Sequence, residues 1–365
     1  MSPENSRITR RQLLSVCLVG LLSPMIRQLP RIASRAAGSA GWLCALAGAP
    51  LLVLYALLLR RLTRRRASGE GMGEVFLRVY GKRLGGALLL LYALWMLAFA
   101  GFVIDSGAVR LTASAYPKGG RLFFVCAEAL FGLLAVLSRP RTLARAANVL
   151  RPFLLVTFAA LLLGGLLSGQ PASLLPVTGA DALPVLRGGA LTADVLLLSA
   201  AFTFLLADVE PEAGGRPLRD VLLSCGTLVL LGTLLTAAVL SAFGPALTLA
   251  QEHPFLAMTR DLRLEGTLER IDALVVGLWV AADFVLLAAM LLSARAIVSL
   301  LLRDGRARVS AVLCAGTAAL SALLCGPGSA LVDRLAEGFF PVSGAVIAFG
   351  LWPLTLAVGL LRKRI

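Results

Sequence analysis

Two acidic residues lie inside long apolar runs of this sequence and are its strongest candidates for chemistry. Asp283 and Glu128 stand near the middle of such runs. A carboxylate at the centre of a bilayer costs about 2.5 to 3.5 kcal/mol on insertion scales, so it usually faces a cavity or a partner group. Eleven residues along an α-helix return to nearly the same face of the helix. The spacing of Asp272 and Asp283 therefore predicts that they form one polar stripe together with Trp279. The stripe predicts either a cation or proton site or a structural hydrogen bond to a neighbouring helix.

No pattern typical of an enzyme occurs in the sequence. The one histidine, His253, follows Glu252 in a polar connection and is expected to be a solvated loop residue. The sequence has no H-E-x-x-H, no G-x-S-x-G and no phosphate-binding loop. The six cysteines lie within or at the ends of apolar runs without a C-x-x-C pair, which is typical of small apolar side chains. We therefore expect no enzymatic activity and no cofactor other than a coupling ion, a proton or sodium.

Composition and hydropathy predict the elements that position these residues. The 365 residues are 58% hydrophobic and 15% charged, with a mean hydropathy of +0.87, whereas soluble domains carry roughly a quarter charged residues. An apolar run of about 20 residues crosses about 30 Å of hydrocarbon as a helix. This favours one all-α integral membrane domain, residues 1–365, with about ten transmembrane helices. The expected spans are residues 12–36, 41–59, 85–111, 120–138, 149–168, 188–208, 218–243, 269–302, 309–325 and 340–361.

The net charge of +15 reflects how the basic residues are distributed between the spans. With the N-terminus in the cytoplasm, 24 of the 35 Lys and Arg residues fall in cytoplasmic connections and tails. Cytoplasmic loops of membrane proteins are enriched in Lys and Arg, so this bias places both termini in the cytoplasm. Because the basic residues do not gather on one domain, they predict contact with membrane lipid and no nucleic acid.

Two of the predicted spans contain a local interruption. In the first, Pro24 lies at mid-membrane, where a proline removes one backbone hydrogen bond. In the sixth, the centre at residues 198–203 is small and polar. These spans are corresponding members of two halves, residues 12–168 and 188–361, and an odd number of helices in each half predicts inverted repeats with a site at the midplane. Pro24 is equally consistent with a simple kink.

Several short motifs follow one another in order along the chain. They are Leu-Pro-Arg at residues 29–31, Ala-Ala-Gly at 36–38 with Trp42, residues 80–85 with 91–92, residues 173–177 with 183–188, and residues 268–274 with 278–280. Together they resemble the B subunit of spore germinant receptors, of the spore germination permease family in the amino acid, polyamine and organocation transporter superfamily. The resemblance covers residues 12 to about 300, and the last two spans agree in hydropathy only.

The resemblance implies a LeuT-like fold of two inverted five-helix repeats. It also implies a receptor complex with a larger A subunit and a C-subunit lipoprotein in the spore inner membrane, where small germinants such as amino acids trigger germination. The unwound part of the first helix is then expected at residues 22–26 and that of the sixth at residues 199–202. The ligand-binding candidates between the first, third, sixth and eighth spans are Leu22, Ser23, Pro24, Met25, Phe102, Ser199, Ala200, Ala201, Phe202 and Asp283.

The sequence departs from this family at the expected site. Relatives carry a glycine-rich break before the Leu-Pro-Arg motif, where this chain has Ser23, Pro24 and Met25. The acidic residue that relatives often carry midway along the sixth helix is missing, and Asp283 takes a position that is usually apolar. Both a receptor for a different germinant and a paralogue with a degraded site fit these differences.

Two functions, and a third simpler one, fit these observations. The leading hypothesis is a ligand-sensing receptor subunit that uses a transporter-type pocket, and the alternative is a secondary active transporter of amino acids or related small solutes. The third is a scaffold that assembles the A and C partners without binding a ligand. The fifth span offers no lysine or carboxylate over residues 154–168, so Asp283 is the expected coupling residue of a transporter. We expect its carboxyl to have no basic neighbour.

Overall fold

Each of the ten apolar runs predicted to span the membrane coincides with a helix or with consecutive helices. The computed structural model describes residues 8–65, 70–114, 120–209, 217–262, 271–304, 308–325, 334 and 338–363. The spans are α1 (Arg10–Ala37), α2 (Cys44–Thr63), α4 (Lys82–Ser114), α5 (Arg121–Leu137), α6 (Pro140–Ser168), α7 (Ala182–Leu197) with η5 (Leu198–Asp208), α8 (Pro217–Ala250), α10 (Ile271–Leu302), α11 (Arg308–Cys325), and α13 (Phe340–Ala345) with η7 (Val346–Leu351) and α14 (Trp352–Leu361).

The lengths of these helices suit a bilayer. Eight segments of the described chain are long and apolar enough to cross a membrane, and one of them, Arg10–Thr63, contains both α1 and α2. The 17 residues of α5 lie at the short end of the usual range for a spanning helix. The described connections hold shorter elements: η2 (Gly38–Leu43), α3 (Met72–Tyr80), η3 (Pro171–Leu174), η4 (Gly179–Asp181) and α9 (Pro254–Asp261).

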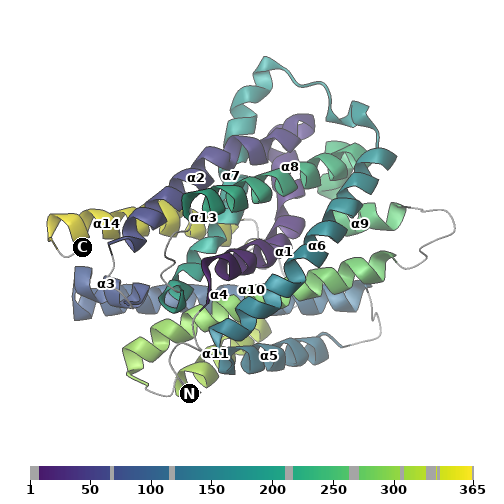
Figure 1. The fold of residues 1–365 in the computed structure, drawn as a ribbon. Helices are drawn as coiled ribbons and strands as arrows, with labels where there is room; N and C mark the ends of the chain where they lie inside the picture. Colours follow the sequence, from purple (N-terminus) through teal and green to yellow (C-terminus); the bar gives the residue numbers. More distant parts are fainter. Residues whose placement is uncertain are drawn as a thin grey trace.

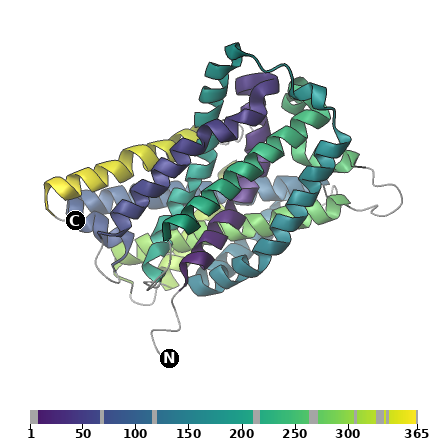
Figure 2. The same cartoon turned by 45° about the horizontal axis from the view of Figure 1, so that its top comes forward.

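The helices form two groups with α1 between them. In one group, α1 and α2 pack against α7 and α8, and in the other, α4, α5, α10 and α11 pack against one another. Figure 1 shows α2, α7 and α8 on one side of α1 and α4, α10, α5 and α11 on the other. α1 also contacts α10 and α6, so it joins the two groups. The last helix, α14, lies against α2 and α3 at the edge of the molecule (Figure 2).

At four positions, equivalent helices of the two predicted halves pack against each other. α1 contacts α7, α2 contacts α8, α4 contacts α10, and α5 contacts α11. Such pairing is what an inverted repeat produces when its halves are related by a two-fold axis in the membrane plane. The boundaries of the halves, residues 12–168 and 188–361, stay a prediction.

The first helix is continuous, and the prediction that it unwinds at residues 22–26 is wrong. α1 runs from Arg10 to Ala37 with both Pro24 and Pro30 inside it. A proline removes only the hydrogen bond of its own missing N–H, and buried neighbours can hold the turn in place. Here the residues around Pro24 are fully buried. Pro24 therefore does not open the helix.

The sixth span is interrupted at the predicted position. α7 ends at Leu197, and the chain continues as the 3₁₀ helix η5 from Leu198 to Asp208. The hydroxyl of Thr203 donates to the carbonyl oxygen of Ala200 at 2.7 Å, which satisfies one backbone acceptor inside the tighter helix. The change of helix type therefore falls on residues 198–203, where small and polar side chains replace the apolar pattern.

Glycines set the close approach of α2 and α7. A Cβ added to Gly189 would lie 2.8 Å from the Cβ of Ala47 and 2.9 Å from the backbone nitrogen of Gly48, and one added to Gly48 would overlap the carbonyl oxygen of Gly189. Small residues at helix crossings let backbones approach closely inside a membrane. This contact fixes α2 against α7.

Candidate functional site

The carboxylate of Asp283 is the centre of a buried polar cluster. Its Oδ1 accepts hydrogen bonds from the Ser23 hydroxyl and, at 3.3 Å, from Nη2 of Arg27. Its Oδ2 accepts a hydrogen bond from Nη2 of Arg110. We call Ser23, Arg27, Arg110, Trp279 and Asp283 the charge cluster. It joins α1, α4 and α10, the helices where the two groups meet.

Aromatic rings hold the two guanidinium groups in place. Arg110 lies over the ring of Trp279 at 4.2 Å from its centroid, and Arg27 lies over the ring of Phe102 at 5.2 Å. The indole N–H of Trp279 donates to the Ser23 hydroxyl at 3.1 Å. Cation–π contacts stabilise a guanidinium most strongly where water is excluded. The rings therefore give each arginine a second favourable contact besides Asp283.

The charge cluster is almost completely buried. Ser23 and Arg110 are 0% exposed and Asp283 is 4% exposed. Burying charges is costly unless they are paired with good geometry, and removing one partner leaves an uncompensated charge. Glu128 on α5 lies near Asp283 and both arginines, and its carboxyl group lies against Gly107 of α4.

This arrangement corrects the expectation that Asp283 has no basic neighbour. Arg27 is one such neighbour: its side chain is only 9% exposed and points to Asp283. Both arginines are distant from Asp283 in the sequence, so no local pattern shows the pairing. The side chain of Asp272 lies outside the described residues, and the structure places the other two residues of the predicted polar stripe, Trp279 and Asp283, in the charge cluster.

The structure brings three of the ten candidate residues together. Ser23 and Asp283 belong to the charge cluster, and Phe102 adjoins it through Arg27. Met25 faces the other way, with its methyl group against Gly232 of α8. The remaining candidates divide into four buried residues of the core and two that line a cavity. The core residues are Leu22, Pro24, Ala200 and Ala201, and the cavity residues are Ser199 and Phe202.

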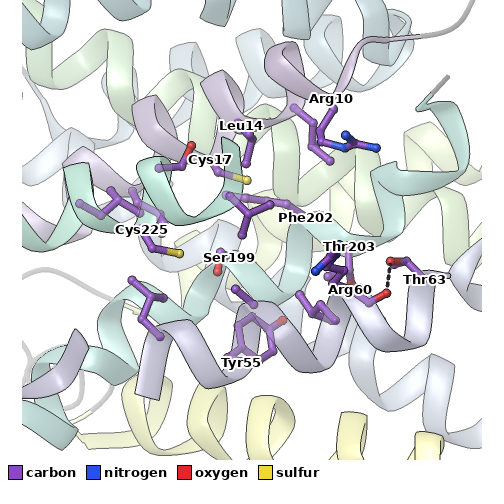
Figure 3. A pocket seen from close by; sticks show the side chains of 18 of the residues that line it. Arg10, Leu14, Cys17, Tyr55, Arg60, Thr63, Ser199, Phe202, Thr203 and Cys225 are labelled. Atoms are coloured by element: carbon purple, nitrogen blue, oxygen red, sulfur yellow. Dashed lines mark hydrogen bonds between the residues drawn. The ribbon is translucent and has the colours of Figure 1, made fainter. Parts of the chain in front are cut away.

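That cavity has a volume of about 250 Å³ and lies between α1, α2, η5 and α8 (Figure 3). Most of its lining is apolar, and its mouth carries Arg10, Arg60 and Arg64. None of the charge-cluster residues lines it. We call it the arginine-rimmed cavity. The residues that were predicted to form one site therefore lie at separate places in the structure, including the charge cluster and a mainly apolar cavity.

Sequence reasoning missed Arg27 and Arg110 as partners of Asp283, and it missed Tyr55, which lines the arginine-rimmed cavity. One signal was available for the first: Ser23 and Arg27 are four residues apart and so share one face of a helix. Arg110 lies inside the span predicted at residues 85–111, where a charge without a partner is costly. No sequence signal singles out Tyr55, which is an ordinary aromatic residue in an apolar run.

His253 lies in the connection between α8 and α9 and contacts the charge cluster from outside the spans. Its ring meets that of Trp279 edge to face, with centroids 5.7 Å apart. The pKa of His253 is lowered from 6.5 to about 4, first because burial disfavours the imidazolium and then because Arg110, Arg27 and Arg31 add positive charge nearby. A hydrogen bond involving the Glu252 backbone opposes this weakly. The histidine is therefore less solvated than predicted.

This lowered pKa predicts that the protein loses stability in mild acid. The unfolded chain takes up the proton near pH 6.5 and the folded chain only near pH 4, so the contribution is complete above pH 6.5 and declines as the pH falls toward 4. We expect the unfolding midpoint of wild type to fall over this range more steeply than that of His253→Gln. Thermal unfolding in detergent at a series of pH values measures the difference. Parallel curves would contradict the prediction.

Comparisons with known proteins agree with this architecture. A family described as spore germination protein matches residues 7–325. The spore germination protein YndE of Bacillus subtilis (strain 168) is 21% identical over 286 residues, which cover 78% of each chain. The transporter Mhp1 of the nucleobase-cation-symport-1 family is similar in fold, in a closed conformation with bromovinylhydantoin bound and in an inward-facing one. Each Mhp1 structure has a TM-score of 0.59 and 14% identity; the similarity covers 100% of this chain and 82% and 80% of the respective Mhp1 chains.

The family match covers most of the chain, and the similarity to Mhp1 extends over all of it. Mhp1 has the LeuT-like fold that the spans and the two helix groups predict. The match is to a permease-type family and not to an enzyme family. This chain therefore belongs to the spore germination protein family and is an integral membrane protein with the fold of a LeuT-type transporter.

Proposed function

We propose that the protein is the membrane subunit of a spore germinant receptor and that it binds a small, amino-acid-like germinant at the charge cluster. The observation that supports this most is Asp283 held between Arg27 and Arg110. Guanidinium groups recognise carboxylates, and a carboxylate recognises an ammonium group, so the cluster offers partners for both ends of a zwitterion. Trp279 and Phe102 supply apolar surface for its side chain.

Ligand binding at this position would change the contact between the two helix groups. In the structure the arginines of α1 and α4 both pair with Asp283 of α10. A bound zwitterion would take over part of these contacts, so the three helices would move relative to one another. A ligand shifts a conformational equilibrium only through such differential contacts. The movement would then reach the receptor A subunit and the C-subunit lipoprotein in the spore inner membrane, with both termini of this chain in the cytoplasm.

A transporter of amino acids or related small solutes is the second candidate, because Mhp1 and this chain share a fold. A coupling cation at Asp283 would lie beside two guanidinium groups, and like charges at close range repel strongly where water is excluded. Sensing without coupled transport therefore fits the charge cluster better. Robust accumulation of labelled amino acid against a pH or sodium gradient, lost in Asp283→Asn, would favour the transporter instead.

Arg27→Gln is expected to weaken binding of the germinant about tenfold or more, because a hydrogen bond to a charged group contributes about 1.5 to 3 kcal/mol. The matched control is Arg35→Gln, which changes an exposed arginine two turns further along α1. Binding of a panel of labelled amino acids to the protein in lipid nanodiscs gives the affinities, and the dose response of spores gives the function. Equal affinity in both variants would place the germinant elsewhere.

A further inference from the structure

The arginine-rimmed cavity is built from one face of each of the elements around it. On α2 its lining residues recur at helical spacing: Leu52, Tyr55, Ala56, Leu59, Arg60 and Thr63. Residues three and four apart share a face of a helix, so this stripe faces the cavity along its whole length. The stripe changes from apolar to basic toward the end of α2. The cavity therefore has an apolar interior and a cationic mouth.

Two hydrogen-bond donors in this lining lack an acceptor. The hydroxyl of Tyr55 and the Nε of Arg60 are buried, and neither has a hydrogen-bond partner among the described residues. Tyr55 is only 2% exposed. A buried polar group without a partner costs about 1 to 3 kcal/mol, so such groups in a native protein call for an explanation. Figure 3 shows Tyr55 and Arg60 extending from the same helix, with Leu14 and Cys17 across the cavity from Tyr55.

We infer that this cavity is a second ligand site, for an amphipathic anion with a short apolar chain and a carboxylate or phosphate head. The apolar chain would fill the interior beside Leu52 and Leu21, and the anionic head would accept hydrogen bonds from Tyr55 and Arg60. An apolar cavity of about 150 Å³ takes up benzene. The 250 Å³ here admits a somewhat longer chain. The ligand is either a soluble fatty carboxylate or an anionic lipid of the surrounding membrane.

This site is separate from the proposed germinant site. Phe202 lines the cavity, and its ring tip lies 3.4 Å from the position of a Cβ on Gly20, one turn of α1 before Ser23. Phe202 therefore contacts α1 one turn before the charge cluster, and no charge-cluster residue lines the cavity. An amphipathic anion bound in the cavity would pack against α1 and η5, the two elements of the first and sixth spans. The inference does not depend on which ligand binds at Asp283.

Binding of labelled octanoate to the full chain in phosphatidylcholine nanodiscs tests the site. We expect saturable binding that weakens about tenfold in Arg60→Gln, because a charge-assisted hydrogen bond is lost. Arg83→Gln changes an exposed arginine at the start of α4 that does not line the cavity, and it should bind as wild type does. Octanol, which has the chain without the charge, should compete at least ten times more weakly. Equal effects of octanol and octanoate, or an unaffected Arg60→Gln, would overturn the inference.

Two tryptophan variants on α2 test whether octanoate binds inside the cavity. Ala56→Trp places a large side chain in the cavity and should abolish octanoate binding. Leu54 is on the same helix but is 55% exposed and does not line the cavity, so Leu54→Trp should leave binding unchanged. Cys17 lines the cavity, and octanoate should slow its modification by a small thiol reagent but not that of the exposed Cys126 on α5. Binding that survives Ala56→Trp would refute the location even if Cys17 does not react.

The composition of the nanodisc distinguishes the two sources of the anion. If an anionic lipid is the natural ligand, phosphatidylglycerol nanodiscs should abolish octanoate binding in wild type and protect Cys17 without added octanoate. If a soluble carboxylate is the ligand, octanoate should bind with the same affinity in both kinds of nanodisc. Either result supports the anion site. Absence of octanoate binding in phosphatidylcholine together with no protection of Cys17 in phosphatidylglycerol would refute it.

Discussion

Asp283→Asn is expected to lower the free energy of unfolding by about 3 to 5 kcal/mol, the usual cost of removing one partner from a buried ion pair. Asparagine keeps the size of the side chain but not its charge, so Arg27 and Arg110 would remain buried without their shared counterion. Unfolding in detergent, by temperature or denaturant, measures the loss. The control Asp261→Asn removes an exposed carboxylate at the end of α9 and should change stability little.

A second substitution tests whether the loss comes from uncompensated charge. Adding Arg110→Met to Asp283→Asn removes one of the two stranded guanidinium groups, so the double variant should recover part of the stability lost in Asp283→Asn alone. Residues that share one network are coupled, and a double-mutant cycle measures that coupling. A double variant less stable than Asp283→Asn would mean that the ion pairs do not dominate the energetics of the charge cluster.

Gly48→Ala is expected to destabilise the protein by about 1 to 3 kcal/mol or more, as overpacking of a close contact does. The added methyl group would overlap the carbonyl oxygen of Gly189, which is backbone and cannot rotate away. α2 and α7 would have to separate. Gly277→Ala is the matched control, because a Cβ at Gly277 in α10 meets nothing within 4 Å. Alanine favours helix over glycine by about 1 kcal/mol, so this control should leave stability unchanged or raise it.

The unfolding assay used for Asp283 also compares the two glycine variants, and the signs of their effects should differ. Loss of stability in Gly48→Ala without loss in Gly277→Ala would identify the α2–α7 crossing as the cause. Equal loss in both variants would instead indicate a general intolerance of helix glycines to substitution.

The spans could be predicted from the sequence because the bilayer imposes a local requirement. About 20 apolar residues in a row are needed wherever a helix crosses, and that signal is present within each run. The interruption of the sixth span was also local, since small and polar residues replace the apolar pattern at residues 198–203. Pro24 misled because the same local signal accompanies both a broken helix and a continuous one, and the packing around it decides the outcome.

The charge cluster was only half predictable, for a related reason. The cost of a buried charge is visible in the sequence at Asp283, but the partner that offsets this cost is not. Ser23 and Arg27 lie 260 and 256 residues away from it, and Arg110 lies 173 away. Tyr55 and the arginine-rimmed cavity were missed for the same reason, since a cavity depends on how four separate elements fit together. One sequence without relatives carries no record of such distant contacts.

The position of Arg27 on the first helix has a consequence for the synthesis of the protein. A ribosome delivers α1 to the membrane long before α10, because 256 residues separate Arg27 from Asp283. During that interval the guanidinium must extend to the lipid surface or remain near the insertion machinery, since alone at mid-membrane it is costly. α1 therefore reaches its final packed position between the two helix groups only after α10 has inserted. Chains that end before Asp283 should accordingly keep their first helix loosely held and accessible to proteases.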